Sequence, residues 1–395
     1  MFVKFDYEKE PSRDILCIDC KSFYASVECA ERGLDPLKTM LVVMSNAENA
    51  GGLVLSASPM AKKVLGVSNV TRKNQVPAHP DLYVVPPRMN LYMKKNQEIN
   101  NLYKKFVADE DHSVFSVDES FLDVTASLSY FHCETAYKMA RIIQRVVYNH
   151  VGIYVTVGIG DNPLLAKLAL DNGAKHSPDF IAEWRYDRVP DTVWQLPSLT
   201  DFWGIDRTFL GKKAQHKAEK SFGNSQILPR DYARRDQIEL VLKELTEQVA
   251  ARLRKAHCQT ECITVYVGYS KGQIDREGRT GWRKQQTIPA TNNTKVLITY
   301  VLALFREHYL AGTDVRQLGL SYGKLVWNES LQLDLFSEPE EQISEMELNY
   351  LIDKIRQKFG FQALIHASSL LEGATAIHRS GLVGGHAGGN VGLGG

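Results

Sequence analysis

Two short acidic stretches that lie far apart in the chain constrain its fold and chemistry more than any other feature. Residues 15–28 begin as an apolar run of strand length that delivers Asp19 at its end. The apolar period then lengthens to suit a helix, so Asp19 is expected at the rim of a buried strand, where the chain turns into a helix. Residues 115–124 alternate polar and apolar side chains as a strand does, and they contain the acidic pair Asp118 and Glu119.

Neighbouring residues of a regular strand face opposite ways, so Asp118 and Glu119 can share one site only near a bend or a strand end. If both converge with Asp19, the three carboxylates need a cation to stay ionised together. Hard oxygen ligands in this number suit Mg²⁺ or Mn²⁺. Each acid taken alone also fits an ordinary solvated turn, so both interpretations stay open at this point.

Composition limits the classes of protein to consider. A chain of 395 residues has room for several domains and a sizeable core. The net charge of +1 gives no global positive field, so any contact with nucleic acid must come from local basic patches. No apolar run is long enough to span a membrane and the N-terminus has no signal-peptide core, so we expect a cytoplasmic protein without membrane partners.

Six cysteines scattered through a long chain argue against a disulfide framework. The spacings of Cys17 with Cys20 and of Cys258 with Cys262 would allow zinc. Cys17 and Cys262 fall within strand-like segments, however, and neither pair lies in a glycine-rich knuckle. Buried thiols are therefore the favoured interpretation.

Hydrophobic periodicity predicts strands and helices in both halves of the chain. Residues 31–85 contain two strand-like runs and a short helix that opens at Ser58 and closes near Gly66. Apolar stripes of helical period run through residues 90–106 and 134–150, and strand-like segments flank them. This mixture predicts a helix-backed, mainly antiparallel sheet.

Two basic regions follow. Residues 186–228 resemble a helix–hairpin–helix repeat, whose tight hairpin would offer backbone amides to a phosphate. Residues 236–325 form a second α/β unit, whose basic patch lies on strands and turns and can follow a phosphate backbone without reading bases. The candidate DNA-binding residues of the two regions are Arg207, Lys212, Arg279, Arg283 and Lys284.

The string IDCKSFYASVE at residues 18–28, followed by VPPRMNLY and then by SVDESFLDVT, resembles the Y-family (UmuC/ImpB-type) translesion DNA polymerases. The motifs stand in the family's order and spacing, and the resemblance covers most of the chain. It implies an α+β right-hand polymerase with a helix-backed antiparallel palm sheet. The expected domains are palm 1–30 and 86–185, small fingers 31–85, helical thumb 186–235, α/β little finger 236–325 and tail 326–395.

The resemblance also implies a catalytic site with two Mg²⁺ ions, or Mn²⁺ in their place. Asp19 and Asp118 would bridge the ions, Glu119 would hold the ion on the primer side, and the main-chain carbonyl of Cys20 would complete the other. One departure concerns Lys21, because many family members carry Asp there. UmuC-type members also lack an acid at this position, so we expect it not to be a ligand.

Other family motifs assign the nucleotide contacts. Tyr24 matches the aromatic residue that excludes a 2′-hydroxyl, and Phe23 beside it is a core residue or a second nucleotide contact. Lys62 and Lys63 are candidates for the triphosphate, with Lys63 in the place of the family's Arg. Lys175 matches the family's later lysine with one extra residue between, and Lys167 matches an earlier lysine, for which a purely structural role is the alternative.

The string QLDLF resembles the pentapeptide by which bacterial polymerases dock on the sliding clamp, with an amide and apolar anchors for a shallow pocket. Its expected contacts are Gln332, Leu333, Leu335 and Phe336. The sequence does not identify the partner of the tail beyond residue 340. An accessory subunit and a recombinase filament are candidates.

The favoured function is a low-fidelity, lesion-tolerant DNA polymerase that binds primer–template DNA and deoxynucleoside triphosphates. The alternative is a catalytically weak paralogue that binds DNA or the clamp and regulates other enzymes. Lys21 and the altered triphosphate contacts keep this alternative open.

Overall fold

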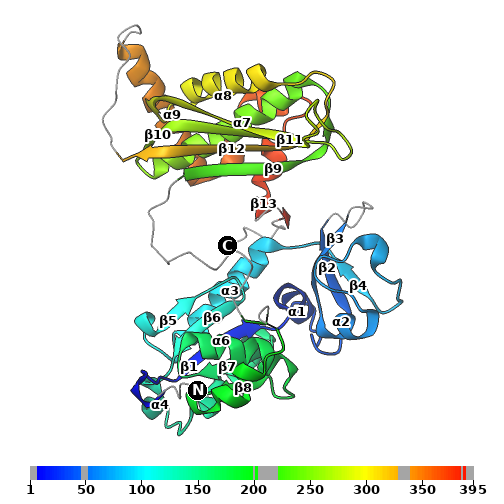
Figure 1. Cartoon of the computed structure of the whole chain (residues 1–395), viewed down its shortest axis with the longest axis vertical. Helices are drawn as coiled ribbons and strands as arrows, with labels where there is room; N and C mark the ends of the chain where they lie inside the picture. Colours follow the sequence, from blue (N-terminus) through cyan, green and yellow to red (C-terminus); the bar gives the residue numbers. More distant parts are fainter. Residues whose placement is uncertain are drawn as a thin grey trace, which may run out of the picture. The chain divides into compact units, whose positions relative to one another are not determined.

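The computed structural model describes residues 7–45, 52–198, 201–202, 221–327, 339–383 and 386–387. The chain divides into two units, which are described separately. Residues 1–213 and 382–395 form the first unit, and residues 214–381 form the second. Figure 1 shows both with the labels used below.

A five-stranded sheet in the order β5-β6-β1-β7-β8 forms the centre of the first unit. Its middle strand, β1 (Ile15–Cys20), pairs antiparallel with β6 (Glu119–Asp123) on one side and with β7 (Val155–Gly160) on the other. At the edges, β5 (His112–Val114) runs antiparallel to β6, and β8 (Ile181–Trp184) runs parallel to β7. The prediction of a mainly antiparallel sheet is confirmed.

Helices cover one face of this sheet with the largest core cluster of the unit. α1 (Phe23–Ala30), α3 (Met89–Tyr103) and α5 (Ala136–Val151) contribute apolar side chains that pack with Leu16 and Ile18 of β1. The short α4 leads into α5 and spans Ser127–Tyr130. The helical stripes seen in the sequence therefore form core, as their period predicts.

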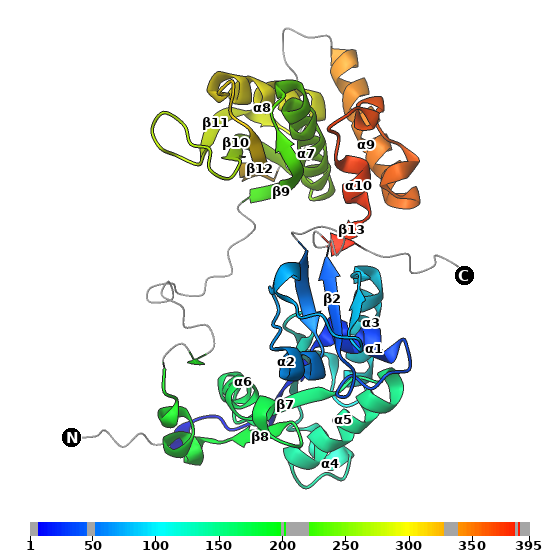
Figure 2. The ribbon, with the colours of Figure 1, turned by 90° about the vertical axis from the view of Figure 1, so that its right-hand side faces the viewer.

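Helix α6 (Pro163–Asn172) covers the opposite face, where it packs against Ile15 and Cys17 of β1. Figure 2 shows α6 beside β7. The two elements approach closely because β7 carries Gly158, where a Cβ would stand 2.0 Å from the carbonyl oxygen of Ala166. Since side chains alternate along a strand, the next odd-numbered residue of β1, Asp19, also faces the side of α6.

A smaller three-stranded sheet, in the order β3-β2-β4, lies in the segment between α1 and α3. Ser58 caps the first turn of α2 by accepting the N–H of Ala61 at 3.2 Å, and Gly66 ends the helix in the left-handed conformation. The element bounds are β2 Leu41–Ser45, β3 Leu53–Ala57, α2 Pro59–Leu65 and β4 Tyr83–Val85.

An ion pair with a buried carboxylate joins α1 to α3. Glu28 is fully buried and accepts two hydrogen bonds from Arg88, at 2.9 and 2.6 Å, and one from the hydroxyl of Tyr92 at 2.7 Å. Arg32 donates a further bond to the same carboxylate. Burial raises the pKa of Glu28, but the bonds from Arg88, Tyr92 and Arg32 outweigh it and leave the pKa below its ordinary value.

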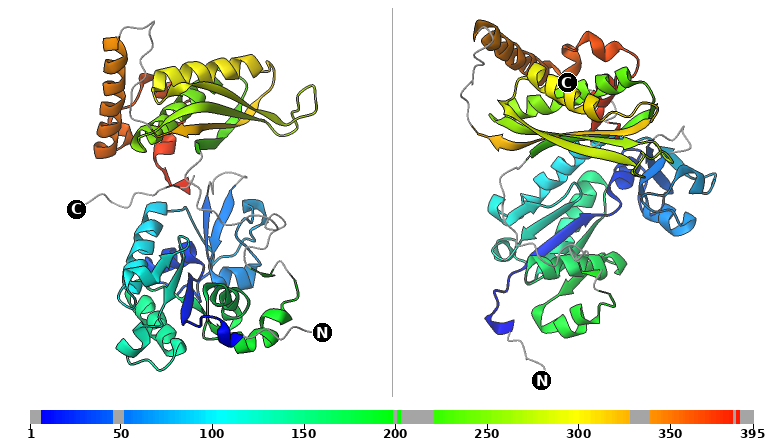
Figure 3. Two further views of the ribbon diagram at one scale, coloured as in Figure 1. Left: turned by 60° about the vertical axis from the view of Figure 1, so that its left-hand side comes forward. Right: turned by 45° about the horizontal axis from the view of Figure 1, so that its top comes forward.

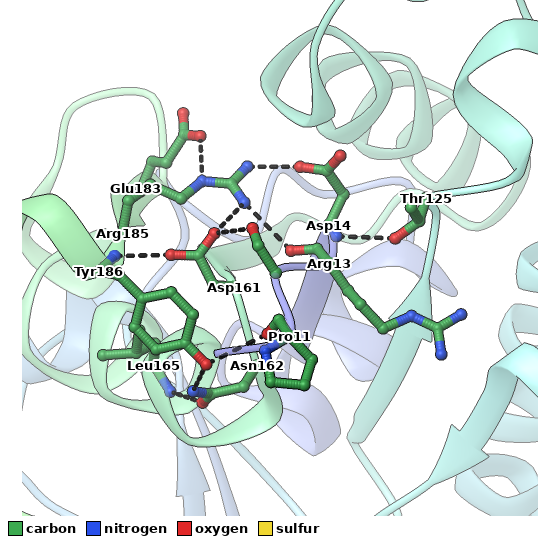
Figure 4. A network of polar contacts seen from close by, with 11 residues as sticks. Pro11, Arg13, Asp14, Thr125, Asp161, Asn162, Leu165, Glu183, Arg185 and Tyr186 are labelled. Atoms are coloured by element: carbon green, nitrogen blue, oxygen red, sulfur yellow. Dashed lines mark hydrogen bonds and ion pairs between the residues drawn. The ribbon is translucent and has the colours of Figure 1, made fainter. Parts of the chain in front are cut away.

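A second polar network holds the chain at the start of β1 (Figure 4). Arg185, just after β8, donates to Asp14 at 2.5 Å and to Asp161 at 3.2 Å. Asp161 is nearly buried and also accepts from Ser12 at 2.7 Å and from the backbone N–H of Tyr186 at 2.6 Å. These donors compensate the buried carboxylate and fix the entry of the chain into the sheet.

The second unit contains a four-stranded antiparallel sheet in the order β11-β10-β12-β9. Figures 1 and 3 show α7 and α8 together on one side of this sheet. The bounds are β9 Ser221–Tyr232, α7 Arg235–Lys255, β10 Gln259–Tyr269, β11 Gly281–Thr291, α8 Thr294–His308 and β12 Val315–Val326.

Strand β9 changes one expected boundary. Residues 221–232 fall in the range expected for the thumb, 186–235, but they pair with β12 in the sheet of the second unit. The sequence predicts a helix–hairpin–helix region at residues 186–228 and not this strand; Pro229 is tolerated within it because β9 is an edge strand. In the described part of residues 186–202 the chain forms two short 3₁₀ helices, Tyr186–Asp191 and Val193–Gln195.

Most of the segment expected as a tail, 326–395, also packs on the second unit where it is described. α9 (Pro339–Phe359) lies beside α7 in Figure 2, and its Asp353 accepts two bonds from the buried Arg254, at 2.6 and 3.1 Å. Glu244 of α7 accepts the N–H of Thr375 at 2.8 Å. The remaining elements are α10 Ala376–Ser380, β13 Leu382–Val383 and β14 His386–Ala387.

The Glu28 network provides a test of the packing of α1. Glu28→Gln leaves Arg88, whose side chain is 33% exposed, without its charged partner, so we expect a loss of about 1.5–3 kcal/mol in the free energy of unfolding. Urea unfolding followed by circular dichroism measures it. Glu134→Gln is the matched control, because Glu134 forms an exposed pair with Lys138 and its loss should leave the midpoint unchanged.

The same network predicts that the free energy of unfolding depends on pH. Because the folded-state pKa of Glu28 is lowered, its stabilising effect is complete above the ordinary Glu value and is lost as pH falls through the lower folded-state value. The Gln variant should therefore lose less stability than the wild type over that acidic range. Equal losses would contradict the assigned role of Glu28.

Candidate active site

Strand pairing brings two of the predicted acids opposite each other. Asp19 is the cross-strand partner of Glu119 in β6 and of Thr156 in β7. Residues directly opposite each other in an antiparallel pair project to the same face of the sheet. Asp19 and Glu119 therefore both point to the face that α6 covers.

Asp118 lies in a bend immediately before β6, so strand alternation does not direct it away from Asp19. Its carbonyl oxygen accepts the N–H of Cys20 at 2.9 Å, which joins this bend to the end of β1. Ser116 Oγ donates to the Asp118 carboxylate at 2.8 Å. The adjacent acids thus meet the condition, set by strand geometry, under which both can serve one site.

A cleft of about 1180 Å³ opens at this end of β1. Eight of the residues predicted for the site line it, and they come from the two acidic stretches and the two lysine-bearing segments. They are Asp19, Cys20, Phe23, Tyr24, Lys62, Lys63, Asp118 and Lys175.

The electrostatic balance around Asp19 is unfavourable for its own ionisation. Burial raises the pKa of Asp19 to about 7, Lys175 opposes this shift, and the negative charges of Asp118 and Glu119 add to it. Lys175 Nζ stands 3.9 Å from Asp19 Oδ2 and offsets the rise only in part. The carboxylate is thus short of positive charge in this arrangement.

Glu119 has a different partner. Its Oε1 accepts a hydrogen bond from Lys167 Nζ and lies 3.8 Å from the Sγ of Cys17. The Glu119 and Lys167 side chains are only 11% and 7% exposed, so the ion pair is largely dry. Glu119 is not among the residues that line the cleft.

Within the described residues, no group of three or more His, Cys, Asp or Glu side chains is already arranged to hold a metal ion. Asp19 and Asp118 nevertheless fit a divalent cation. Both offer carboxylate oxygens to one cleft, and burial among like charges leaves Asp19 in need of a counter-charge. Glu119 can join them only by exchanging Lys167 for the ion.

The aromatic residues of the first helix also meet the cleft. The Tyr24 ring stacks on Tyr92, with centroids 4.6 Å apart and planes inclined by 17°. Since the Tyr92 hydroxyl is bonded to Glu28, the buried network described above fixes the ring on which Tyr24 rests. Phe23 packs against Tyr24 at 5.6 Å and is only 3% exposed, so most of its surface is core. The apolar stripe of residues 90–106, which contains Tyr92, predicted core there but not this contact with Tyr24.

Four lysines line the cleft: Lys21, Lys62, Lys63 and Lys175. Lys62 Nζ donates to Ser22 Oγ at 3.1 Å, and Lys21 Nζ lies 4.3 Å from the centre of the Phe180 ring. Burial lowers the pKa of both Lys21 and Lys62; Asp19 opposes the shift, and Lys175 adds to it. Such a concentration of cations suits a polyanionic ligand.

The residues of the predicted basic patch in the second unit differ in how available they are to a phosphate. Arg283 and Lys284 are exposed on β11, where Arg283 pairs across the strands with Tyr266. Arg279 lies in the turn before β11 and is bound to Asp275 at 2.8 Å and to Glu277 at 2.7 Å. Arg279 is therefore less available to a phosphate than its two neighbours.

Several predicted residues lie outside the described part of the chain. They are the thumb residues Arg207 and Lys212 and the clamp-binding residues Gln332, Leu333, Leu335 and Phe336.

All six cysteines are buried and free of disulfides. Cys17 packs on the α6 face of β1 and Cys20 on the opposite face, so these two cannot bind one zinc ion. Among the described helices, none is both long and apolar enough to cross a lipid bilayer.

Comparison with known proteins agrees with the fold and with the motifs. Residues 18–171 match the impB/mucB/samB family, and residues 219–335 match the impB/mucB/samB family C-terminal domain. A solved Y-family DNA polymerase chimera of Dbh and Dpo4 shares the fold, with a TM-score of 0.58 and 22% identity over 80% of this chain and 100% of that one. The fold is thus that of a Y-family polymerase.

Two relatives from Bacillus subtilis (strain 168) match nearly the whole chain. UvrX, whose name links it to the repair of UV damage, is 34% identical over 96% of this chain and 99% of its own length. A protein named DNA polymerase IV 2 is 31% identical over 94% of this chain and 98% of its own length. The chain belongs to the impB/mucB/samB (UmuC/ImpB-type) family, which confirms the resemblance found in the sequence.

Proposed function

We propose that this chain is a DNA-directed DNA polymerase that copies damaged templates with low fidelity by two-metal nucleotidyl transfer. Its family and the relative named DNA polymerase IV 2 support the enzyme class. The observation that carries the chemistry is the meeting of Asp19 and Asp118 in one cleft with four lysines. A site that binds a nucleoside triphosphate needs acidic residues to hold the cations and basic residues to contact the phosphates.

Divalent cations bound there would lower the pKa of the primer 3′-hydroxyl and neutralise the leaving pyrophosphate. Asp19 and Asp118 would hold them from the sheet, with the Cys20 carbonyl, and Glu119 would contribute after leaving Lys167. The cations suit Mg²⁺ or Mn²⁺, because the ligands are oxygen atoms.

The lysines of the cleft would bind the triphosphate. Lys62 and Lys63 approach from α2 and Lys175 from the segment after α6, so the polyanion would be held between the two sheets of the first unit. Lysine supplies point charges where the family's Arg supplies a planar fork, so orientation depends on several lysines acting together. Lys21 adds a fourth charge, which compensates for the missing fork.

Contacts with primer–template DNA would come from the second unit and the region before it. α7 and α8 cover one face of the sheet, and Arg283 and Lys284 lie exposed on its edge strand β11. Phosphate contacts of this kind bind without reading sequence and weaken as salt is raised. Binding to the phosphate backbone in this way suits a polymerase that must accept distorted templates.

The alternative, a catalytically weak paralogue that regulates other enzymes on DNA or the clamp, rests on two observations. Glu119 is held by Lys167, and Lys21 introduces a positive charge two residues from Asp19. Primer extension by the wild type distinguishes the alternatives, because the regulatory protein would bind DNA without extending it.

The first prediction concerns Asp118→Asn. Wild-type protein with Mg²⁺ should extend a primer on undamaged and abasic templates, and the variant should lose extension by roughly 10²-fold or more while DNA binding holds. Asp123→Asn is the matched control, since Asp123 lies on β6 but pairs with Arg13 away from the cleft. Activity of Asp118→Asn equal to that of the wild type would refute the mechanism. Loss of DNA binding together with primer extension would indicate that the acids have a structural role.

A second prediction concerns sugar selection. The Tyr24 ring would pack under the deoxyribose, so Tyr24→Ala should lower the preference for deoxy- over ribonucleotides by at least about tenfold, or 1.4 kcal/mol. Tyr24→Phe keeps the ring and should keep the preference. The ratio of kcat/KM for the two nucleotides measures it, and unchanged discrimination in the Ala variant would remove Tyr24 from this role.

The third prediction concerns docking on the sliding clamp through residues 332–336. Changing Gln332, Leu333, Leu335 and Phe336 to alanine should abolish the stimulation of synthesis by the clamp and leave basal synthesis intact. Ser337→Ala, next to the motif, is the control. Full stimulation of the fourfold variant would show that the clamp binds elsewhere.

A further inference from the structure

A series of alternating charges connects Glu119 to Asp19 through three residues that the mechanism uses only in part. Lys167 Nζ donates to Glu119 and also lies 3.1 Å from Asp171 Oδ2. Lys175 Nζ lies 2.6 Å from Asp171 Oδ1 and 3.9 Å from Asp19 Oδ2. Asp171 is thus the common partner of both lysines.

Helix geometry fixes this arrangement. Lys167, Asp171 and Lys175 are spaced four residues apart, so they share one side of α6 and of the 3₁₀ helix Ala174–His176 that follows. The close contact of α6 with Gly158 holds that side over the sheet. Each carboxylate of the sheet, Glu119 and Asp19, consequently faces one lysine.

The ion pair of Glu119 with Lys167 raises an energetic difficulty for catalysis. If Glu119 turns to a divalent cation, it must leave Lys167, whose side chain is only 7% exposed. A buried ammonium that loses its partner carries a penalty of several kcal/mol. Asp171 removes the difficulty, because it already contacts Lys167 and remains with it when Glu119 departs.

Asp171 also acts on the other lysine. Its 2.6 Å contact holds Lys175, while the distance from Lys175 to Asp19 stays at 3.9 Å. Without Asp171, both lysines would have only the two metal-binding carboxylates as close acidic partners among these five residues. They would then compete directly with divalent cations for Asp19 and Glu119.

We propose that Asp171 is a positioning residue that holds Lys175 away from Asp19 and remains as the partner of Lys167 when Glu119 leaves it, and so makes both carboxylates available to divalent cations. This inference rests on the proposed function, in which those carboxylates hold the catalytic ions. A merely structural Asp171, one more helical ion pair, would change stability without changing metal affinity.

Binding of Mn²⁺ to the full chain, measured by electron paramagnetic resonance without DNA or nucleotide, tests the inference. Asp171→Asn should weaken this binding by roughly 10–100-fold, the usual effect of losing a group that orients a metal ligand. Asp171→Glu keeps the charge and should retain most of the affinity. Urea unfolding of each variant shows whether stability changes in parallel.

A double-mutant cycle separates action through Lys167 from a general loss of negative charge. Lys167→Met removes the competitor of the metal ion, so Asp171→Asn should weaken Mn²⁺ binding less in that background than in the wild type. Equal weakening in both backgrounds would overturn the inference. So would unchanged Mn²⁺ affinity of Asp171→Asn, or a loss in Asp171→Glu as large as in the Asn variant.

The failure of this inference can be told from the failure of the proposed function. Wild-type protein that extends primers and binds Mn²⁺, with affinity unchanged by Asp171→Asn, would reject the positioning role alone. Wild-type protein that neither extends primers nor binds Mn²⁺ through Asp19 would reject both. In the first case, the Mg²⁺ concentration for half-maximal extension should also be the same for the two proteins.

Discussion

The burial of the Asp19 carboxylate beside two other acids is the constraint on which the rest of the site depends. Its pKa of about 7 reflects burial, opposed by Lys175 and increased by Asp118 and Glu119. Burying a charge without a close partner is unfavourable, and a bound cation would compensate it here. The four lysines of the cleft balance the acids without pairing closely with Asp19, so the site can take both cations and a polyanion.

Packing contacts on several sides hold this arrangement in place. Strand β1 is held between β6 and β7, which fixes Asp19 opposite Glu119 and Thr156. On one face the absence of a side chain at Gly158 brings α6 and its lysines onto the sheet. On the other face the buried Glu28 bonds Tyr92, on which the ring of Tyr24 rests. Packing far from the cleft therefore determines where its lysines and its aromatic ring lie.

Much of this could be predicted from the sequence because the signals were local. The change of period after Asp19 marked the junction of strand and helix, Ser58 and Gly66 marked the ends of α2, and the stripe at 134–150 marked α5. The α+β class and the family followed from such signals together with the order of the motifs.

What could not be predicted depends on contacts between distant segments. The pair of Glu119 with Lys167 arises from the packing of α6 on the sheet, and the stacking of Tyr24 on Tyr92 arises from the packing of α1 on α3. Strand β9 was missed because residues 186–228 were interpreted as a helix–hairpin–helix region, whereas residues 221–232 pair with the distant strand β12. The packing of α9 on α7 was missed because Arg254 has its partner, Asp353, far along the chain.

The most direct test of the central claim is crystallographic. Crystals of the full chain with primer–template DNA, a non-hydrolysable deoxynucleoside triphosphate and Mn²⁺ allow the ions to be located by anomalous diffraction. The account predicts Mn²⁺ bound directly by carboxylate oxygens of both Asp19 and Asp118, with Glu119 moved away from Lys167. Ions located elsewhere, with Asp19 bound to protein side chains alone, would contradict it.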